Sequence, residues 1–318
     1  MIRFLHRILP ESPKKLFWAS VLYTLIFVAL LVYLSIFWLS QYGLLIFILV
    51  PFLLGALPVM LYSCKHYPDR RLAANLGIAT FISANFLAFF LAFEGVMCLL
   101  MAFPITLTFL FTGNFIAYYF VEEAKKNHRL FLPILIVIPP VIMLDINRDP
   151  QLFSVTTSIE INADTKEVWE NVVTFPELNA PEELMFRYGI SYPINATIKG
   201  NGVGAVRYCN FNTGSFVEPI TTWEDEKLLA FDVVEQPVPK QELSFWDIDA
   251  PHLHDFFVSK KGQFKLSTLP NGNTLLEGTT WYYNNIYPAF YWKWWSDYII
   301  HKIHYRVLNH IKINAESK

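Results

Sequence analysis

The residues best suited to chemistry in the C-terminal half are an arginine and a glutamate on neighbouring predicted strands. Arg207 alternates with the small or apolar residues Ala205 and Cys209, so the three share one face of a strand. Glu218 lies on the next strand, where it can face Arg207. A charged pair that points into an apolar cavity would orient a polar group of a ligand. The alternative is an ordinary ion pair at the rim of the sheet, because a one-residue error in strand phase inverts the face.

Histidines are the next candidates, since this side chain titrates near neutral pH and binds metals. His252 and His254 alternate and would share a face of an extended segment. They supply only two of the three or four ligands that zinc needs, so we predict a hydrogen-bonding role at the rim of a site and no metal. His304 lies beside the apolar stripe of the last helix, where it either reaches the cavity or is a core histidine with satisfied hydrogen bonds.

Signatures of an enzyme are missing from the sequence. It has no nucleophile elbow, P-loop, dinucleotide fingerprint or carboxylate dyad. Its cysteines, Cys64, Cys98 and Cys209, form neither a disulfide framework nor a CxxC metal spacing. A net charge of −2 without a basic stripe argues against nucleic acid as a partner. We therefore predict no cofactor and no nucleic acid, and the sequence does not support assignment as an enzyme.

Predicted strands and helices give the C-terminal half an α+β order. A strand at 153–162 precedes a helix for which Asp164 is the expected N-cap. Six more strands are predicted at residues 194–199, 205–211, 216–223, 228–234, 262–269 and 274–283.

A long closing helix is predicted from Pro288 to about Ile313. Its apolar residues recur every three or four positions. They are Trp292, Trp295, Ile299, Ile303, Val307 and Ile311. Such a stripe must be buried, and the concave face of the sheet is its only large partner.

Four segments carry a resemblance to a known family. They are "SVTTSIEINADTKEVWENVVTFPEL", "GNGVGAVRY", "VEPITTWEDEKLLAFDVV" and "NGNTLLEGTTWYY". With the closing helix they resemble the START-related SRPBCC (START/Bet v1-like) superfamily, especially its polyketide cyclase/dehydrase and lipid-transport branch. The resemblance covers residues 153–313 and excludes the N-terminal half.

This resemblance implies a helix-grip fold, with an antiparallel sheet wrapped around the C-terminal helix and a cavity for a hydrophobic small molecule between them. The hairpin at 212–216 would lie at the cavity mouth. The long connection at 236–261 would form a lid. The predicted ligand contacts are Arg207, Cys209, Glu218, Phe231, His254, Tyr282, Trp295, Ile299 and His304.

The N-terminal half predicts a bundle of membrane spans. Hydrophobic residues make up 54% of the chain, and the excess is concentrated before residue 145. Spans are predicted at residues 16–39, 42–62, 73–93 and 96–120, each long enough to cross ~30 Å of hydrocarbon. A fifth, at 130–144, is short and contains Pro139-Pro140. We predict that it crosses; the alternative is a re-entrant or interfacial segment.

Basic residues predict the orientation. They cluster before the first span, between the second and third, and after the fourth, and the intervening turns have none. Because cytoplasmic loops retain Lys and Arg, the N-terminus is expected in the cytoplasm. Five crossings would then place the second domain, residues 150–318, on the periplasmic or extracytoplasmic side of a bundle formed by residues 1–145.

Together these features predict a membrane-tethered domain that binds or transfers a hydrophobic, lipid-like molecule at the bilayer. One alternative is a cyclase or dehydratase that acts on a membrane-soluble substrate, with Arg207, Glu218 and a lid histidine as acid–base groups. Another is a ligand-dependent sensor or assembly factor whose lid at 236–260 docks a protein partner.

Overall fold

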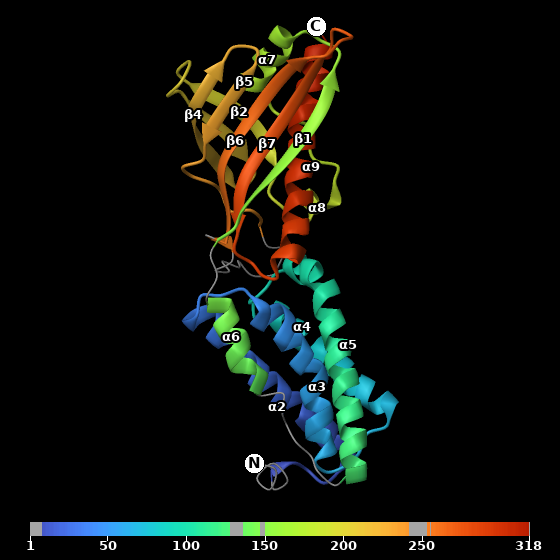
Figure 1. Ribbon diagram of the computed structural model, residues 1–318. Helices are drawn as coiled ribbons and strands as arrows, with labels where there is room; N and C mark the ends of the chain where they lie inside the picture. Colours follow the sequence, from blue (N-terminus) through green and yellow to red (C-terminus); the bar gives the residue numbers. More distant parts are fainter. Residues whose placement is uncertain (1–7, 128–135, 147–149, 242–252, 255, 318) are drawn as a thin grey trace. The chain divides into compact units, whose positions relative to one another are not determined.

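The computed structural model describes residues 8–127, 136–146, 150–241, 253–254 and 256–317 (Figure 1). The chain divides into two compact units, an N-terminal unit up to residue 149 and a C-terminal unit from Pro150.

All the regular secondary structure described in the N-terminal unit is helical. Its helices are α2 (Pro13–Tyr33) with η1 (Leu34–Trp38), η2 (Leu45–Leu49) with α3 (Val50–Ser63), α4 (Arg70–Phe90), α5 (Val96–Asn127) and α6 (Ile138–Ile146). Among the described residues, four stretches are long and apolar enough to span a membrane: Pro13–Trp38, Leu45–Ser63, Arg70–Phe90 and Val96–Lys125. They coincide with the four predicted hydrophobic segments, and α5 continues to Asn127, beyond the predicted end at 120.

Glycines and an asparagine allow close packing of the helices in this unit. A Cβ atom at Gly55 of α3 would lie 2.0 Å from the carbonyl oxygen of Leu110, and one at Gly113 of α5 would lie 2.1 Å from that of Phe52. The backbones of α3 and α5 therefore touch, as small residues permit between closely packed helices. Asn114 donates from Nδ2 to the carbonyl oxygens of Gly55 and Ala73, at 3.2 and 2.7 Å, and so joins three helices.

Asp145, near the end of α6, binds the start of the second long helix. Its Oδ1 and Oδ2 accept hydrogen bonds from the backbone N–H groups of Leu44 and Leu45, both at 2.8 Å. A Cβ atom at Gly43 would lie 2.3 Å from Oδ1, so glycine is required for this approach. The carboxylate thus satisfies two of the amides that every helix leaves unpaired at its N-terminus.

The C-terminal unit contains one antiparallel sheet of seven strands in the order β1-β7-β6-β5-β4-β3-β2. The strands are β1 (Leu152–Ile161), β2 (Pro193–Lys199), β3 (Val206–Phe211), β4 (Gly214–Glu224), β5 (Leu228–Asp232), β6 (Phe257–Thr268) and β7 (Thr274–Asn284). Two short helices, α7 (Thr165–Val173) and α8 (Leu184–Arg187), follow β1. As predicted, Asp164 caps α7, because its Oδ1 accepts from the Glu167 N–H at 2.9 Å.

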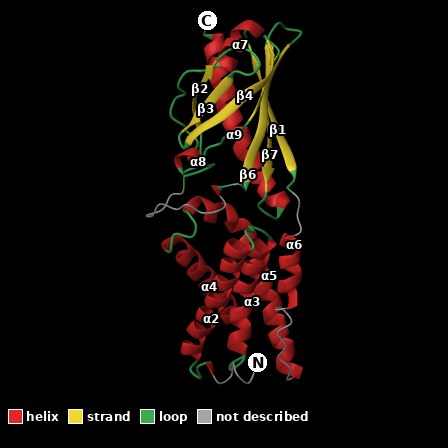
Figure 2. Cartoon of the chain, turned by 90° about the vertical axis from the view of Figure 1, so that its left-hand side faces the viewer, coloured by secondary structure: helices red, strands yellow, loops and turns green. Residues whose placement is uncertain are grey.

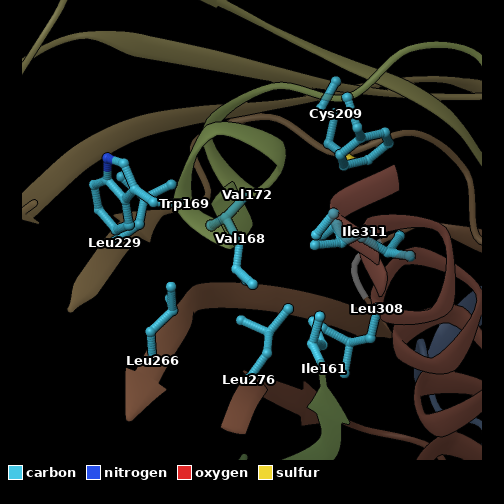
Figure 3. Packing of buried hydrophobic residues seen from close by; sticks show 14 of the residues in the cluster. Ile161, Val168, Trp169, Val172, Cys209, Leu229, Leu266, Leu276, Leu308 and Ile311 are labelled. Carbon is cyan, nitrogen blue, oxygen red and sulfur yellow. The ribbon is translucent and has the colours of Figure 1, made fainter. Parts of the chain in front are cut away.

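Helix α9 (Ala289–Glu316) closes the unit and runs along the inner side of the curved sheet (Figures 1 and 2). It packs on β1 and β7 and also contacts α7. In Figure 3, Val168 of α7, Leu276 of β7 and Ile311 of α9 converge in the core. A seven-stranded antiparallel sheet around a C-terminal helix is consistent with the predicted helix-grip fold.

Strand β6 corrects the prediction of a lid. The lid was expected to end at 261, but β6 begins at Phe257, so residues 257–261 belong to the sheet. The register of β6 against β7 shifts between Ser259 and Lys261, which is a β-bulge. A bulge inserts an extra residue and breaks the alternation that reveals a strand. Residues 242–252 and 255 of the predicted lid lie outside the described residues.

Candidate ligand pocket

A pocket of about 120 Å³ lies between the inner face of the sheet and α9. Its apolar wall is mostly aromatic and includes Phe211, Phe216, Phe231, Phe257, Phe264 and Ile303. Pockets for drug-sized ligands hold roughly 300–1,000 Å³, whereas a dry apolar cavity of about 150 Å³ accepts benzene. The space as it stands suits one ring or the end of a chain.

Arg207 and Glu218 form an ion pair in the wall of this pocket. They face each other in the β3–β4 register, and Arg207 Nη1 donates to Glu218 Oε2. Only 1% of Arg207 and 5% of Glu218 is exposed. The inward phase predicted for Arg207 is therefore the one that the sheet adopts.

Aromatic rings surround the guanidinium group. Its Cζ lies 5.6, 5.5 and 5.4 Å from the ring centroids of Phe175, Phe231 and Phe264. Distances below about 6 Å allow favourable cation–π contacts. These rings and the carboxylate together compensate a charge that water cannot reach.

Burial and mutual interactions shift the pKa values of Arg207, Glu218 and the neighbouring Cys209. Burial raises the pKa of the Glu218 carboxyl, and the Arg207 charge works against this rise. Burial disfavours the Arg207 charge, but the interactions with Glu218 and Cys209 together outweigh that effect and raise the pKa of the guanidinium. Burial and the Glu218 charge raise the pKa of the neighbouring Cys209 thiol to about 12. Cys209 is therefore a neutral wall residue at physiological pH and a poor nucleophile.

His304 is a fixed, neutral group on the α9 side of the pocket. Its Nε2 lies 2.8 Å from Thr280 Oγ1, and its Nδ1 lies 3.0 Å from Thr157 Oγ1. The exposed His301 shares the Thr157 hydroxyl, at 2.7 Å. Burial, followed by the nearby His301, lowers the pKa of His304 to about 4. Both ring nitrogens thus have hydroxyl partners and the ring carries no charge at pH 7.

The structure places five of the nine predicted contact residues at the pocket. These are Arg207, Cys209, Glu218, Phe231 and His304. Their contact with a ligand stays a prediction.

Tyr282 and His254 lie elsewhere. Tyr282 is on the expected inner face, but its ring packs against Phe153 and Phe257 and its O–H donates to Asp297 at 2.6 Å. These contacts fill the space between β7 and α9 beyond the pocket. His254 is exposed.

Trp295 and Ile299 do not line the pocket, because the face of α9 that is buried differs from the apolar stripe predicted for this helix. The residues buried on this helix are Trp292, Ser296, Ile300, Val307, Leu308, Ile311 and Ala315. Ser296 is polar but buried, because it donates to the carbonyl oxygen of Trp292 and accepts from Asn284. Because Ser296 is buried and the neighbouring Trp295 is only half-buried, the stripe expected from hydrophobicity alone is shifted by one residue.

Sequence reasoning missed several pocket residues. Ile300 follows from the corrected phase of α9, and Phe257 and Ser259 belong to the part of β6 that the bulge hides. Thr280 could have been found, since it alternates with Tyr282 on β7. Within the described residues, no cluster of three or more His, Cys, Asp or Glu could hold a metal ion.

Comparison with known proteins gives likeness only to solved structures. No family model and no curated protein matches the chain. Truncated norcoclaurine synthase from Thalictrum flavum is 13% identical, over 52% of this chain and 94% of its own, with a TM-score of 0.34. The Aha1 dimer structure from Colwellia psychrerythraea is 14% identical, over 51% and 98%, with a TM-score of 0.30. The Zhui aromatase/cyclase from Streptomyces sp. R1128 is 12% identical, over 52% and 94%, with a TM-score of 0.34.

These likenesses cover about half of the chain. The description of the C-terminal unit as a helix grip rests on its own strand order and closing helix.

Proposed function

We propose that the C-terminal unit binds a hydrophobic small molecule in the pocket between the sheet and α9, and that the N-terminal helices anchor it in a membrane. The observation that carries the proposal is an aromatic pocket with a buried ion pair in its wall. Replacing a buried ion pair by apolar residues is often neutral or stabilising, so stability alone gives little reason for this pair. A few placed polar groups in an apolar pocket are typical of small-molecule sites.

The pKa values of two pocket residues, His304 and Cys209, make these two residues poor acid–base catalysts. A general acid or base works best when its pKa lies near the working pH. His304, with a pKa of about 4, and Cys209, with a pKa of about 12, are far from neutrality. A lipid-like ligand would enter this volume with one end only.

Filling the pocket tests this function. Gly278 lines it, and a Cβ atom there would make ordinary contacts, 3.6 Å from Leu308 and 3.7 Å from Phe264. We expect Gly278→Leu to occupy the pocket and abolish binding of benzene-sized probes by the full chain in nanodiscs, measured by ligand-observed NMR. Glu277→Leu adds the same side chain to the neighbouring position on β7 and should leave binding unchanged. Equal binding by both variants would contradict the proposal.

We also propose that the chain crosses the membrane five times. The ends of the helices in the N-terminal unit carry the argument. His66 Nε2 lies 2.9 Å from the carbonyl oxygen of Glu11, and Lys125 Nζ lies 5.7 Å from the Tyr67 ring centroid. Residues 11, 66–67 and 125 are therefore at one end of the bundle.

Asp145 is at the opposite end, because it binds the amides of Leu44 and Leu45 at the start of a helix whose other end is Ser63. We infer that the 17 residues from 128 to 144 connect the two ends of the bundle. About 17–25 residues are needed for a helical crossing. The positions of Lys14, Lys65, Arg70 and Lys125 support a cytoplasmic location for the first end, and the C-terminal unit would then lie on the other side.

Reporter fusions test this topology. A reporter that is active only outside the cytoplasm should be active after Lys318 and inactive after Asn127, with the opposite result for a cytoplasmic reporter. The same response at both sites would mean that residues 128–144 do not cross.

A further inference from the structure

We infer that the pocket selects a neutral ligand with a hydrogen-bond acceptor, a carbonyl or ether oxygen on a body of about one ring, and that Arg207 Nε donates to this oxygen. This inference rests on the proposed function and names the ligand class for the same pocket.

The Nε–H group of Arg207 is the observation behind it. Nη1 is used by Glu218, and the Cys209 thiol is a further hydrogen-bonding neighbour of the guanidinium. The Nε atom is fully buried and has no hydrogen-bond partner among the residues that the structure describes. A buried N–H without a partner costs about 1–3 kcal/mol. Because Arg207 lines the pocket, an acceptor from a ligand there would remove that cost.

The other cationic and imidazole groups of the pocket are already engaged. His304 has a hydroxyl on each ring nitrogen. The amine of Lys261 lies 4.7 Å from the Trp281 ring centroid, on an exposed residue. Among the described residues that line the pocket, Arg207 Nε is thus the fully buried side-chain donor without a hydrogen-bond partner.

The ion pair disfavours the binding of an anionic ligand. Glu218 already neutralises Arg207 at the same site. A second carboxylate would lose its hydration and face Glu218 in a medium where like charges repel strongly. A neutral oxygen accepts the free N–H without either cost.

Size and wall chemistry limit the rest of the molecule. The volume of about 120 Å³ is close to that of a cavity that takes one six-membered ring. Phe231 and Phe264 flank the guanidinium, so the apolar body of the ligand would lie against the aromatic wall.

A pair of probes of equal shape tests the inference. Cyclohexanone and methylenecyclohexane differ in an oxygen replaced by a CH₂ group. We expect the full chain in nanodiscs to bind cyclohexanone at least about ten-fold more tightly, after correction for partitioning into lipid, because a hydrogen bond to a charged group contributes that much. Cyclohexanecarboxylate should bind more weakly than cyclohexanone.

The outcomes separate this inference from the proposed function. If no probe binds, both are overturned. If both uncharged probes bind equally, the pocket function stands and the ligand class is wrong. If cyclohexanecarboxylate binds most tightly, the selection for a neutral ligand is wrong.

Two variants assign the preference to Arg207. The double substitution Arg207→Met with Glu218→Leu replaces the pair by apolar residues, and it should bind both uncharged probes equally. Glu218→Gln keeps the shape of the side chain and leaves the arginine charge uncompensated. It should reverse the charge selectivity, so that cyclohexanecarboxylate binds more tightly than cyclohexanone. A ketone preference that survives the double substitution, or an unchanged selectivity in Glu218→Gln, would overturn the role of Arg207.

Discussion

Arg207 and Glu218 face each other across β3 and β4, and their ion pair is enclosed by the sheet and by three phenylalanine rings. Each charge depends on the other, because neither has access to water. This dependence leads to a prediction about stability.

Arg207→Met alone should be strongly destabilising. It leaves Glu218 buried without its counter-charge, and breaking a buried pair in this way costs about 3–5 kcal/mol. Replacing both residues, Arg207→Met with Glu218→Leu, should restore most of the loss. Thermal unfolding of the full chain in detergent, with hydrogen exchange of β3 and β4 as the local readout, measures both. A double variant as unstable as the single one would contradict this account.

His304 should make the C-terminal unit less stable in mild acid. Its pKa is lowered to about 4 in the folded chain, from 6.5 for an unperturbed group. Between these values the unfolded chain binds more protons than the folded one, so stability falls as pH drops from 6.5 towards 4. From pH 7 to pH 5 the loss is about 2 kcal/mol. His304→Asn should show a smaller loss over the same interval in thermal unfolding, and His301→Asn, at the exposed neighbour, should retain most of it.

Asp145→Ala should weaken the N-terminal unit more than an ordinary cap substitution does. It leaves the partly buried amide of Leu44 and the buried amide of Leu45 without their carboxylate, and a buried N–H without a partner costs about 1–3 kcal/mol. Asp69 is the matched control, since it caps α4 from an exposed position through the Leu72 N–H at 2.7 Å. Asp69→Ala should cost about 1 kcal/mol. Equal shifts of the melting temperature would mean that the Asp145 contact is unimportant.

Gly55→Ala should separate α3 from α5. The new Cβ atom would overlap the Leu110 carbonyl oxygen, which is backbone and cannot rotate away. We expect a lower melting temperature and faster proteolysis of the N-terminal unit in detergent. Thr108→Ala, at an exposed position of α5, makes a small change on the outer face of the same helix and should have little effect.

The sequence predicted the elements that have a regular period. The four long hydrophobic helices, the Asp164 cap and the alternation that turns Arg207 inward all follow from local patterns. The β-bulge of β6 and the buried Ser296 interrupt such a period, and there the predicted end of the lid and the predicted phase of α9 were wrong.

Other features of the site depend on contacts between distant residues. The rings of Phe175 and Phe264 meet Arg207 only once the sheet and the loop before β2 have formed. The volume of the pocket depends on how closely α9 approaches the sheet, which no local pattern specifies. For the same reason the partner of Asp145, 100 residues earlier at Leu45, could not be predicted.

The separation of Asp145 from Leu44 and Leu45 in the sequence also determines when this contact can form during synthesis. The amides of Leu44 and Leu45 leave the ribosome long before Asp145 does, and at about 5–20 residues per second the delay is roughly 5–20 s. Until Asp145 is synthesised, the amides of Leu44 and Leu45 at the start of the second long helix lack this carboxylate partner. Helix α6 therefore completes a contact that the start of the second long helix cannot make when it is synthesised. A chain that ends before residue 145 lacks this contact.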